Sequence, residues 1–169
     1  MGTATVAIQS GPPPISAPPE FAELYKRHAD LVYHAALRVT GSGADAEDIL
    51  QSVFLRILTR EDRLDGTRSP EAYLRRAAIN AGIDLIRRRA ARPHEAVDER
   101  LMNPAESSPV LKERLRRAIA ALAPRDAEMF VLRYVEGLSN GELADLFDIE
   151  RVTVATRLHR IRQHLQEIL

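Results

Sequence analysis

The sequence LSNGELADLFDIERVTVATRLHRIRQHL, residues 138–165, decides the fold of the C-terminal part of the chain. Ser139 and Glu142 stand three residues apart, which is the spacing of a capping box, and they predict a short helix that ends near Phe147. A tight turn follows, and a longer helix then runs from about Arg151 to the end of the chain. Its apolar residues form one stripe, Val154, Leu158, Ile161 and Leu165. The stretch therefore predicts two helices joined by a tight turn.

The side of the longer helix that faces away from this stripe is basic. It presents Arg151, Ala155, Thr156, His159, Arg160 and Gln163, and no acid occurs between Arg151 and His164. Arginine suits guanine edges and phosphates, and threonine or histidine suits either. This is the anatomy of a helix-turn-helix, whose second helix enters the DNA major groove. The pattern leaves one alternative open, an ordinary helical hairpin with a solvated basic face.

The rest of the chain also predicts helices. Apolar periodicity and capping signals place them at about 20–40, 44–60, 70–91, 109–122 and 124–136, and no stretch alternates as a strand would. Residues 1–19 hold five of the ten prolines and predict a disordered leader, and residues 93–108 have the mixed composition of a linker. We therefore expect an all-α chain with two small helical domains, 20–92 and 109–169, joined by that flexible linker.

Charge is segregated along the chain although its formal sum is zero. Residues 41–55 carry three acids and no base, whereas residues 70–93 and 151–164 are basic. At 100° per residue, one narrow face of the helix over 70–91 holds Tyr73, Arg76, Asn80, Asp84 and Arg87, with Arg88 beside it. A ring, an amide and guanidinium groups can stack on unpaired bases and hold phosphates. A solvated face whose basic end complements the helix dipole explains the arginines equally well, and Asp84 is expected to pair with Arg87 or Arg88.

Composition excludes several classes of function. The chain has no cysteine, so a disulfide, a thiolate metal site and a cysteine nucleophile are excluded. Its five histidines never form an i, i+4 ligand pair, and it holds neither a phosphate-cradling glycine loop nor a nucleophile motif. We therefore expect no catalytic residue, no metal and no cofactor. The sequence also predicts no membrane insertion and no signal peptide, which indicates a cytoplasmic protein.

Three separated motifs together resemble one family. DAEDILQSVFLRIL (45–58), SPEAYLRRAAINAGIDLIRRR (69–89) and LAPRDAEMFVLRYVEGLSNGELADLF (122–147), the last followed by TRLHRIRQHL (156–165), resemble bacterial RNA polymerase sigma factors of the extracytoplasmic-function (ECF) class. The resemblance covers about residues 21–169, in the order and spacing of the family. It implies a protein that binds core polymerase, directs it to promoters and helps to melt the −10 element.

The resemblance also implies partners and site residues. The first domain would dock on the clamp of the largest polymerase subunit through Asp45, Asp48, Gln51, Ser52 and Leu55. It would bind the −10 element through Tyr73, Arg76, Asn80, Asp84, Arg87 and Arg88, with the loop 61–68 capturing a flipped base. The second domain would contact the flap of the second-largest subunit and bind the −35 duplex through Arg151, Thr153, Thr156, Arg157, His159 and Arg160. An anti-sigma factor is a further implied partner.

The chain departs from the family pattern at several positions. Tyr73 stands where many members have tryptophan, and the usual GTVKSR is VTVATR, so that Val152, Ala155 and Thr156 replace a glycine, a base and a serine. The turn glycine is Asp148, a residue type that tolerates the left-handed backbone conformation. Two other functions remain open, a helix-turn-helix regulator that acts without polymerase and a helical adaptor that binds only protein.

Overall fold

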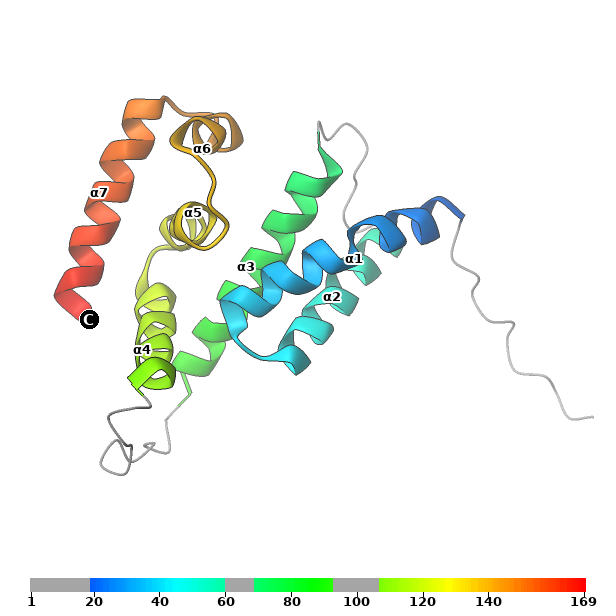
Figure 1. The fold of residues 1–169 in the computed structure, drawn as a ribbon, viewed down its shortest axis with the longest axis horizontal. Coiled ribbons are helices and arrows are strands. Elements are labelled where there is room, and N and C mark those ends of the chain that lie inside the picture. The colour runs from blue at the N-terminus through cyan, green and yellow to red at the C-terminus, as the bar shows by residue number, and fades with distance from the viewer. Residues whose placement is uncertain (1–18, 60–68, 93–106) are drawn as a thin grey trace, which may run out of the picture.

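The structure is a computed structural model, and it describes residues 19–59, 69–92 and 107–169. Within these ranges every regular element is a helix (Figure 1). The helices are α1 (Pro19–Thr40), α2 (Gly43–Leu58), α3 (Pro70–Ala90), α4 (Ser107–Ala121), α5 (Pro124–Tyr134), α6 (Asn140–Phe147) and α7 (Arg151–Ile168). The all-α prediction is confirmed, and the predicted helix ends agree within two residues. Most of the predicted leader and linker, and the loop 61–68, lie outside the described residues.

Helices α1, α2 and α3 form a first helical group. The side chain of Ser42 accepts a hydrogen bond from the Asp45 backbone at the start of α2, and Ser69 does the same for Ala72 at the start of α3, where Pro70 takes the first helical position. The buried faces of the three helices meet in one core, which includes Val32, Ala36, Val53, Phe54, Leu74, Ile79 and Ile83. Aliphatic side chains make up most of this core, and Phe21 and Tyr25 pack edge-on against the buried Phe54, with ring centroids 6.0 and 4.8 Å away.

A glycine sets how closely α1 and α3 approach. Gly82 lies in the middle of α3 and is buried. A Cβ added there would lie 2.9 Å from Cγ1 and 3.0 Å from Cβ of Val39, a buried residue of α1. Val39 is branched at Cβ and cannot swing aside as a long flexible side chain could. The two helices therefore pack at a distance that only glycine at position 82 allows without a shift.

Helices α4, α5, α6 and α7 form a second helical group. The predicted capping box opens α6, because the Glu142 backbone donates to the Ser139 hydroxyl and the Ser139 backbone donates to the Glu142 carboxylate. That bond from Ser139 holds the pKa of Glu142 below its usual value. Asp148 ends α6 in the left-handed conformation, with φ 52° and ψ 52°, as its place at the turn predicts. The apolar stripe of α7 is buried throughout.

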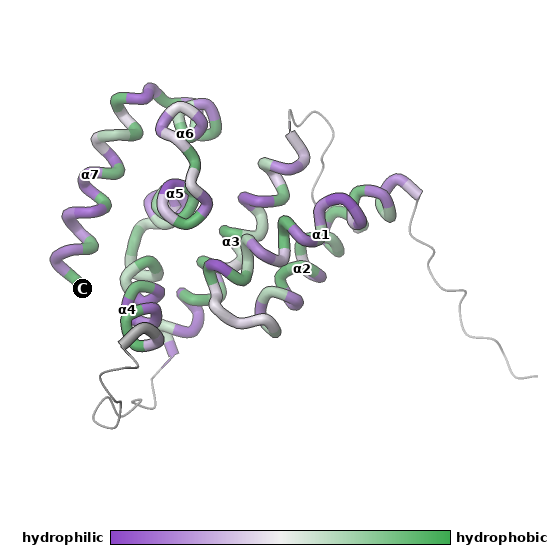
Figure 2. The backbone as a smooth tube through the Cα atoms, viewed as in Figure 1, coloured by the Kyte–Doolittle hydropathy of each residue, from purple (hydrophilic) through white to green (hydrophobic). Residues whose placement is uncertain are grey.

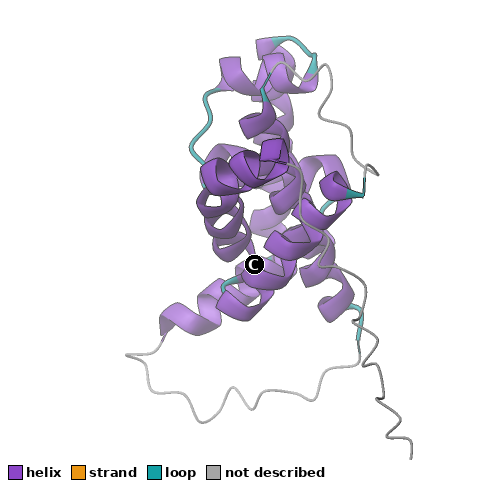
Figure 3. Cartoon of the chain, turned by 90° about the vertical axis from the view of Figure 1, so that its right-hand side faces the viewer, coloured by secondary structure: helices purple, strands orange, loops and turns teal. Residues whose placement is uncertain are grey.

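The two groups are in contact along α3. Figure 1 shows α3 between α1 and α2 on one side and the second group on the other, and α3 packs against both α4 and α5. Figure 3, turned by 90°, shows the described residues as helices with short connections. Figure 2 shows polar and apolar residues interleaved along the helices of both groups, as amphipathic packing requires. The sequence predicts the two groups but not the contact between them.

No helix in the described part of the chain is both long enough and apolar enough to cross a bilayer.

Candidate nucleic-acid interface

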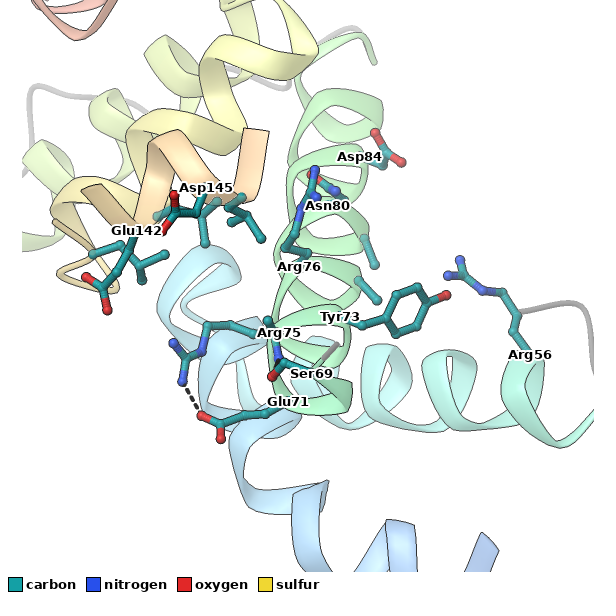
Figure 4. Close-up of a pocket in the computed structure, with 16 residues that line it drawn as sticks. Arg56, Ser69, Glu71, Tyr73, Arg75, Arg76, Asn80, Asp84, Glu142 and Asp145 are labelled. Carbon is teal, nitrogen blue, oxygen red and sulfur yellow. Dashed lines mark hydrogen bonds and ion pairs between the residues drawn. The ribbon is translucent and has the colours of Figure 1, made fainter. Parts of the chain in front are cut away.

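The polar face predicted on α3 lines a groove. Tyr73, Arg76, Asn80 and Asp84 all border a cavity of about 820 Å³, together with residues of α5, α6 and the connection between them. Figure 4 shows these four side chains on one side of α3, with the Tyr73 ring directed toward Arg56 of α2 and the acids of α6 across the groove. The helical spacing thus brings the predicted residues together, as the sequence implies.

Two of these side chains are held by a carboxylate of the second group. The Arg76 Nε donates to Oε1 of Glu128 over 2.6 Å, and the Asn80 amide donates to the same oxygen over 3.1 Å. Glu128 lies on α5 and is only 5% exposed. The Arg76 guanidinium also lies 5.2 Å from the ring centroid of Phe147. In this arrangement an acid of the same chain satisfies donors that were predicted to bind DNA.

Arg87 is held in a similar way further along α3. Its guanidinium donates to the backbone oxygens of Ala120 and Leu122, over 3.3 and 2.7 Å. These carbonyls lie at the end of α4, where helical carbonyls lack partners within the helix. The expected pair between Asp84 and Arg87 is present but long, at 3.9 Å. Arg88 is exposed.

A further ion pair joins the two groups near the C-terminal end of α1. Arg38 donates two hydrogen bonds to Glu136, over 2.7 and 2.9 Å. The Glu136 side chain is 4% exposed. Its carboxylate raises the pKa of Arg38 above the ordinary value. Acids of the second group therefore meet arginines of the first at two separate places.

The predicted docking residues on α2 divide into two kinds. Asp45 is buried, and Arg89 of α3 donates to both of its carboxylate oxygens over 2.6 Å. These bonds hold the pKa of Asp45 below its usual value. By contrast, four residues are exposed on the helix surface: Asp48, Gln51, Ser52 and Leu55. In this structure Asp45 ties α2 to α3, whereas the other four form an open patch, which we call the α2 patch.

The outer face of α7 is open. Arg151, Thr153, Thr156, His159 and Arg160 are all exposed, and within the described residues no acid pairs with either arginine of this set. Arg157, which was predicted to contact the −35 duplex, donates from its Nε to Asp126 of α5 over 2.6 Å. At 100° per residue, Arg157 lies at the edge of the buried stripe, within reach of α5. The structure therefore places it between α7 and α5 rather than on the outer face.

Sequence reasoning missed Glu128, Arg89 and the Arg38–Glu136 pair. Each contact joins residues far apart in the sequence, such as Asn80 and Glu128 at a separation of 48. The sequence does contain one indication of the Glu128 contact, because Glu128 is an acid on the apolar side of an otherwise amphipathic helix. Among the described residues, no three histidine or acidic side chains are placed to hold a metal ion.

Comparisons with known proteins match both groups. Residues 24–92 match the family described as Sigma-70 region 2, and residues 112–165 match Sigma-70, region 4. The ECF RNA polymerase sigma factor SigE of Mycolicibacterium smegmatis is 34% identical over 164 residues, covering 91% of this chain. This chain spans 63% of the length of that relative. The RNA polymerase sigma-E factor of Streptomyces coelicolor is 31% identical over 152 residues, covering 89% of this chain and 86% of its own length.

A solved structure shares the fold. It is the co-crystal structure of the sigma factor RpoE with the anti-sigma factor NepR from Bartonella quintana. It matches with a TM-score of 0.51 and 19% identity, covering 88% of this chain and 96% of that one.

Proposed function

The chain belongs to the sigma-70 family of RNA polymerase sigma factors, in its ECF class, and from this premise we propose how its three surfaces divide the work of transcription initiation. Sigma factors are DNA-binding initiation factors and not enzymes, which fits a chain built from binding surfaces. The α2 patch binds core polymerase at the clamp of the largest subunit. The polar face of α3 binds separated strands of the −10 element, and the outer face of α7 binds the −35 duplex.

The observation that carries this proposal is the α2 patch. Leu55 is 58% exposed, and it lies two turns along the same face of α2 as the exposed acid Asp48. An acidic surface repels the phosphates of DNA, and an exposed leucine gains free energy only when a partner buries it. Neither feature serves a regulator that binds duplex DNA alone. A protein partner would bury the leucine and accept the acid, and this supports core polymerase as the partner of the α2 patch.

The −10 proposal requires the two helical groups to separate. The donors of Arg76 and Asn80 that hold Glu128 cannot bind a phosphate or a base edge at the same time. We propose that the second group leaves α3 when the chain binds polymerase and promoter. Contacts to the separated strands then offset the few kcal/mol that unstacking a base costs.

The −35 proposal rests on the open face of α7. Its arginines lack acidic partners within the described residues, and the preceding capped helix and left-handed Asp148 fix the turn that presents them. Arg151 and Arg160 would contact phosphates or guanine edges. The role we propose for Arg157 is to hold α7 against α5 through Asp126.

An anti-sigma factor is a further proposed partner. RpoE, which shares this fold, was crystallised with the anti-sigma factor NepR. We propose that a corresponding factor binds this chain and that the flap of the second-largest polymerase subunit contacts its second helical group.

Run-off transcription with purified core polymerase from the host tests the proposed function. We expect specific initiation from host promoters when the chain is added and none when it is omitted. A chain that neither binds core nor confers initiation on any host promoter would overturn the proposal. Binding to duplex DNA without binding to core would favour the regulator, and binding to neither would favour the adaptor.

The polymerase contact can be tested with a matched pair of charge changes. Asp48→Arg should weaken core binding about tenfold or more, because it reverses the one charge of the α2 patch. Glu23→Arg makes the same change on α1, where Glu23 is exposed, and should leave core affinity unchanged. Core affinity is measured by fluorescence anisotropy of the labelled chain. Equal effects of the two changes would exclude a specific contact at Asp48.

A further inference from the structure

One apolar side chain on α7 has no role in the fold. Val152 is 73% exposed, the highest value among the large apolar side chains of the described residues. It stands at the second position of the helix. A β-branched residue there lowers helix propensity relative to alanine, and an exposed one buries nothing in return. The packing of this protein therefore gives no reason for a valine at this position.

Val152 lies in the middle of the face that points away from the protein. At 100° per residue it shares a stripe with Thr156 and His159, opposite the buried stripe of Val154 and Leu158. All three residues of the outer stripe are exposed. Any duplex that docks on this face meets Val152 first, because the first turn of a recognition helix lies deepest against the base edges.

The surroundings of Val152 are poor in hydrogen-bond donors. The Thr156 hydroxyl donates to the backbone oxygen of Val152 over 3.0 Å, so its hydrogen is not free to bind a base. Ala155, exposed on the same turn, carries only a methyl group. Arg157 is turned toward Asp126. The centre of the first turn is thus an apolar surface, with Arg151 at one edge and the exposed Thr153 at the other.

The major groove of DNA offers one apolar group to such a surface. Each base pair presents donors and acceptors there, and thymine alone adds the C5-methyl group. We infer that Val152 contacts the C5-methyl of a thymine in the −35 duplex and selects an A·T pair at the position below the first turn. This inference rests on the proposed function of α7, and it names the base that this helix distinguishes.

Removing the methyl group from the DNA tests the inference. The probe is a duplex that carries the −35 element of a promoter active in the run-off assay, bound by the holoenzyme formed with the full chain. Each thymine of the element is replaced in turn by deoxyuridine, which differs only in lacking the methyl. We expect one thymine whose replacement weakens binding about fourfold, the value of one buried methyl group.

The matching protein change is Val152→Ala. It should weaken binding to the thymine duplex about fourfold, as the deoxyuridine replacement does. It should also remove the difference in affinity between thymine and deoxyuridine at that one position. Leu111→Ala, which shortens another exposed apolar side chain on α4, should leave the difference intact. Circular dichroism checks that the variants fold.

Three outcomes overturn the inference. A holoenzyme that binds the duplex without any dependence on a thymine methyl contradicts it, and so does a methyl dependence that Val152→Ala leaves unchanged. In both cases duplex binding itself persists and the proposed function stands. A holoenzyme that binds no −35 duplex overturns the inference and the proposed role of α7 together.

Discussion

The polar face of α3 and the outer face of α7 are built from similar residues but stand in opposite states. On α3, Arg76 and Asn80 are bound to Glu128, and Arg87 is bound to the end of α4. On α7, Arg151 and Arg160 are exposed and have no acidic partner among the described residues. One face is closed by the protein itself and the other is open to solvent.

We attribute this difference to the DNA that each helix is proposed to bind, because the two faces carry similar side chains. Under the proposed function, α7 can remain exposed because duplex DNA presents its grooves without any change in the protein. Separated strands exist only after melting, and before that the donors of α3 are satisfied by Glu128. We propose that this contact keeps the −10 surface occupied until the promoter is bound.

The largest expected effect is on stability and comes from the close packing of α3 against α1. Gly82→Ala should destabilise this group by about 2 kcal/mol, because the new Cβ meets Val39 and the overpacking exceeds the gain in helix propensity. Gly141→Ala in α6 is the matched change and should stabilise slightly, because its Cβ would lie 3.7 Å from Ser139 Oγ and 3.9 Å from Arg151 Nε. Thermal unfolding of both variants measures this, and shifts of the same sign would contradict the close packing of α1 and α3.

Acid should weaken the contact between α2 and α3. The pKa of Asp45 is below its usual value in the folded chain, so the bond to Arg89 stabilises fully above about pH 5 and is lost as the pH falls below about 4. We expect this pair to contribute about 1–2 kcal/mol. Asp45→Asn should lower stability at pH 7 and flatten its decline in acid, measured by urea unfolding between pH 3 and 7. A variant with the same acid profile as the parent chain would exclude this role.

Releasing the α3 face from Glu128 should raise its affinity for single-stranded DNA without changing the α7 face. Glu128→Gln removes the charge that holds Arg76 while keeping the shape of the side chain, and it should raise the affinity of the free chain for a single-stranded −10 oligonucleotide about tenfold. Affinity for the −35 duplex should stay within about twofold. Asp145→Asn removes a charge from the same groove at an exposed position and is the control. An equal gain from both variants would mean that general charge, and not the Glu128 contact, closes the face.

The smallest expected effect is on α7. Arg160→Ala should lower the salt dependence of −35 binding by about one phosphate contact and leave single-strand binding unchanged. Binding is measured at several salt concentrations, and an unchanged slope would exclude a phosphate contact at Arg160.

Local features of the fold could be predicted from the sequence because their causes are local. Ser139 with Glu142, Ser69 with Pro70, and Asp148 in the turn each act through neighbours within a few residues, and the structure confirms all three. The faces of α3 and α7 follow from helical spacing in the same way. Spacing cannot show which acid from elsewhere in the chain meets a basic face. For this reason Glu128, the Asp126 partner of Arg157 and the Arg89 partner of Asp45 emerged only from the structure.

The distance between the two helical groups tests the central claim most directly. The chain has no cysteine, so Lys26→Cys in α1 and Gln166→Cys in α7, both exposed, provide two specific sites for fluorescent labels. Energy transfer is compared between the free chain and the holoenzyme bound to a promoter with a pre-melted −10 bubble. We predict a single compact state in the free chain, a clear change in transfer on the promoter, and a partial change in free Glu128→Gln. The same transfer in the free chain and on the promoter would contradict the claim that α3 exchanges Glu128 for DNA.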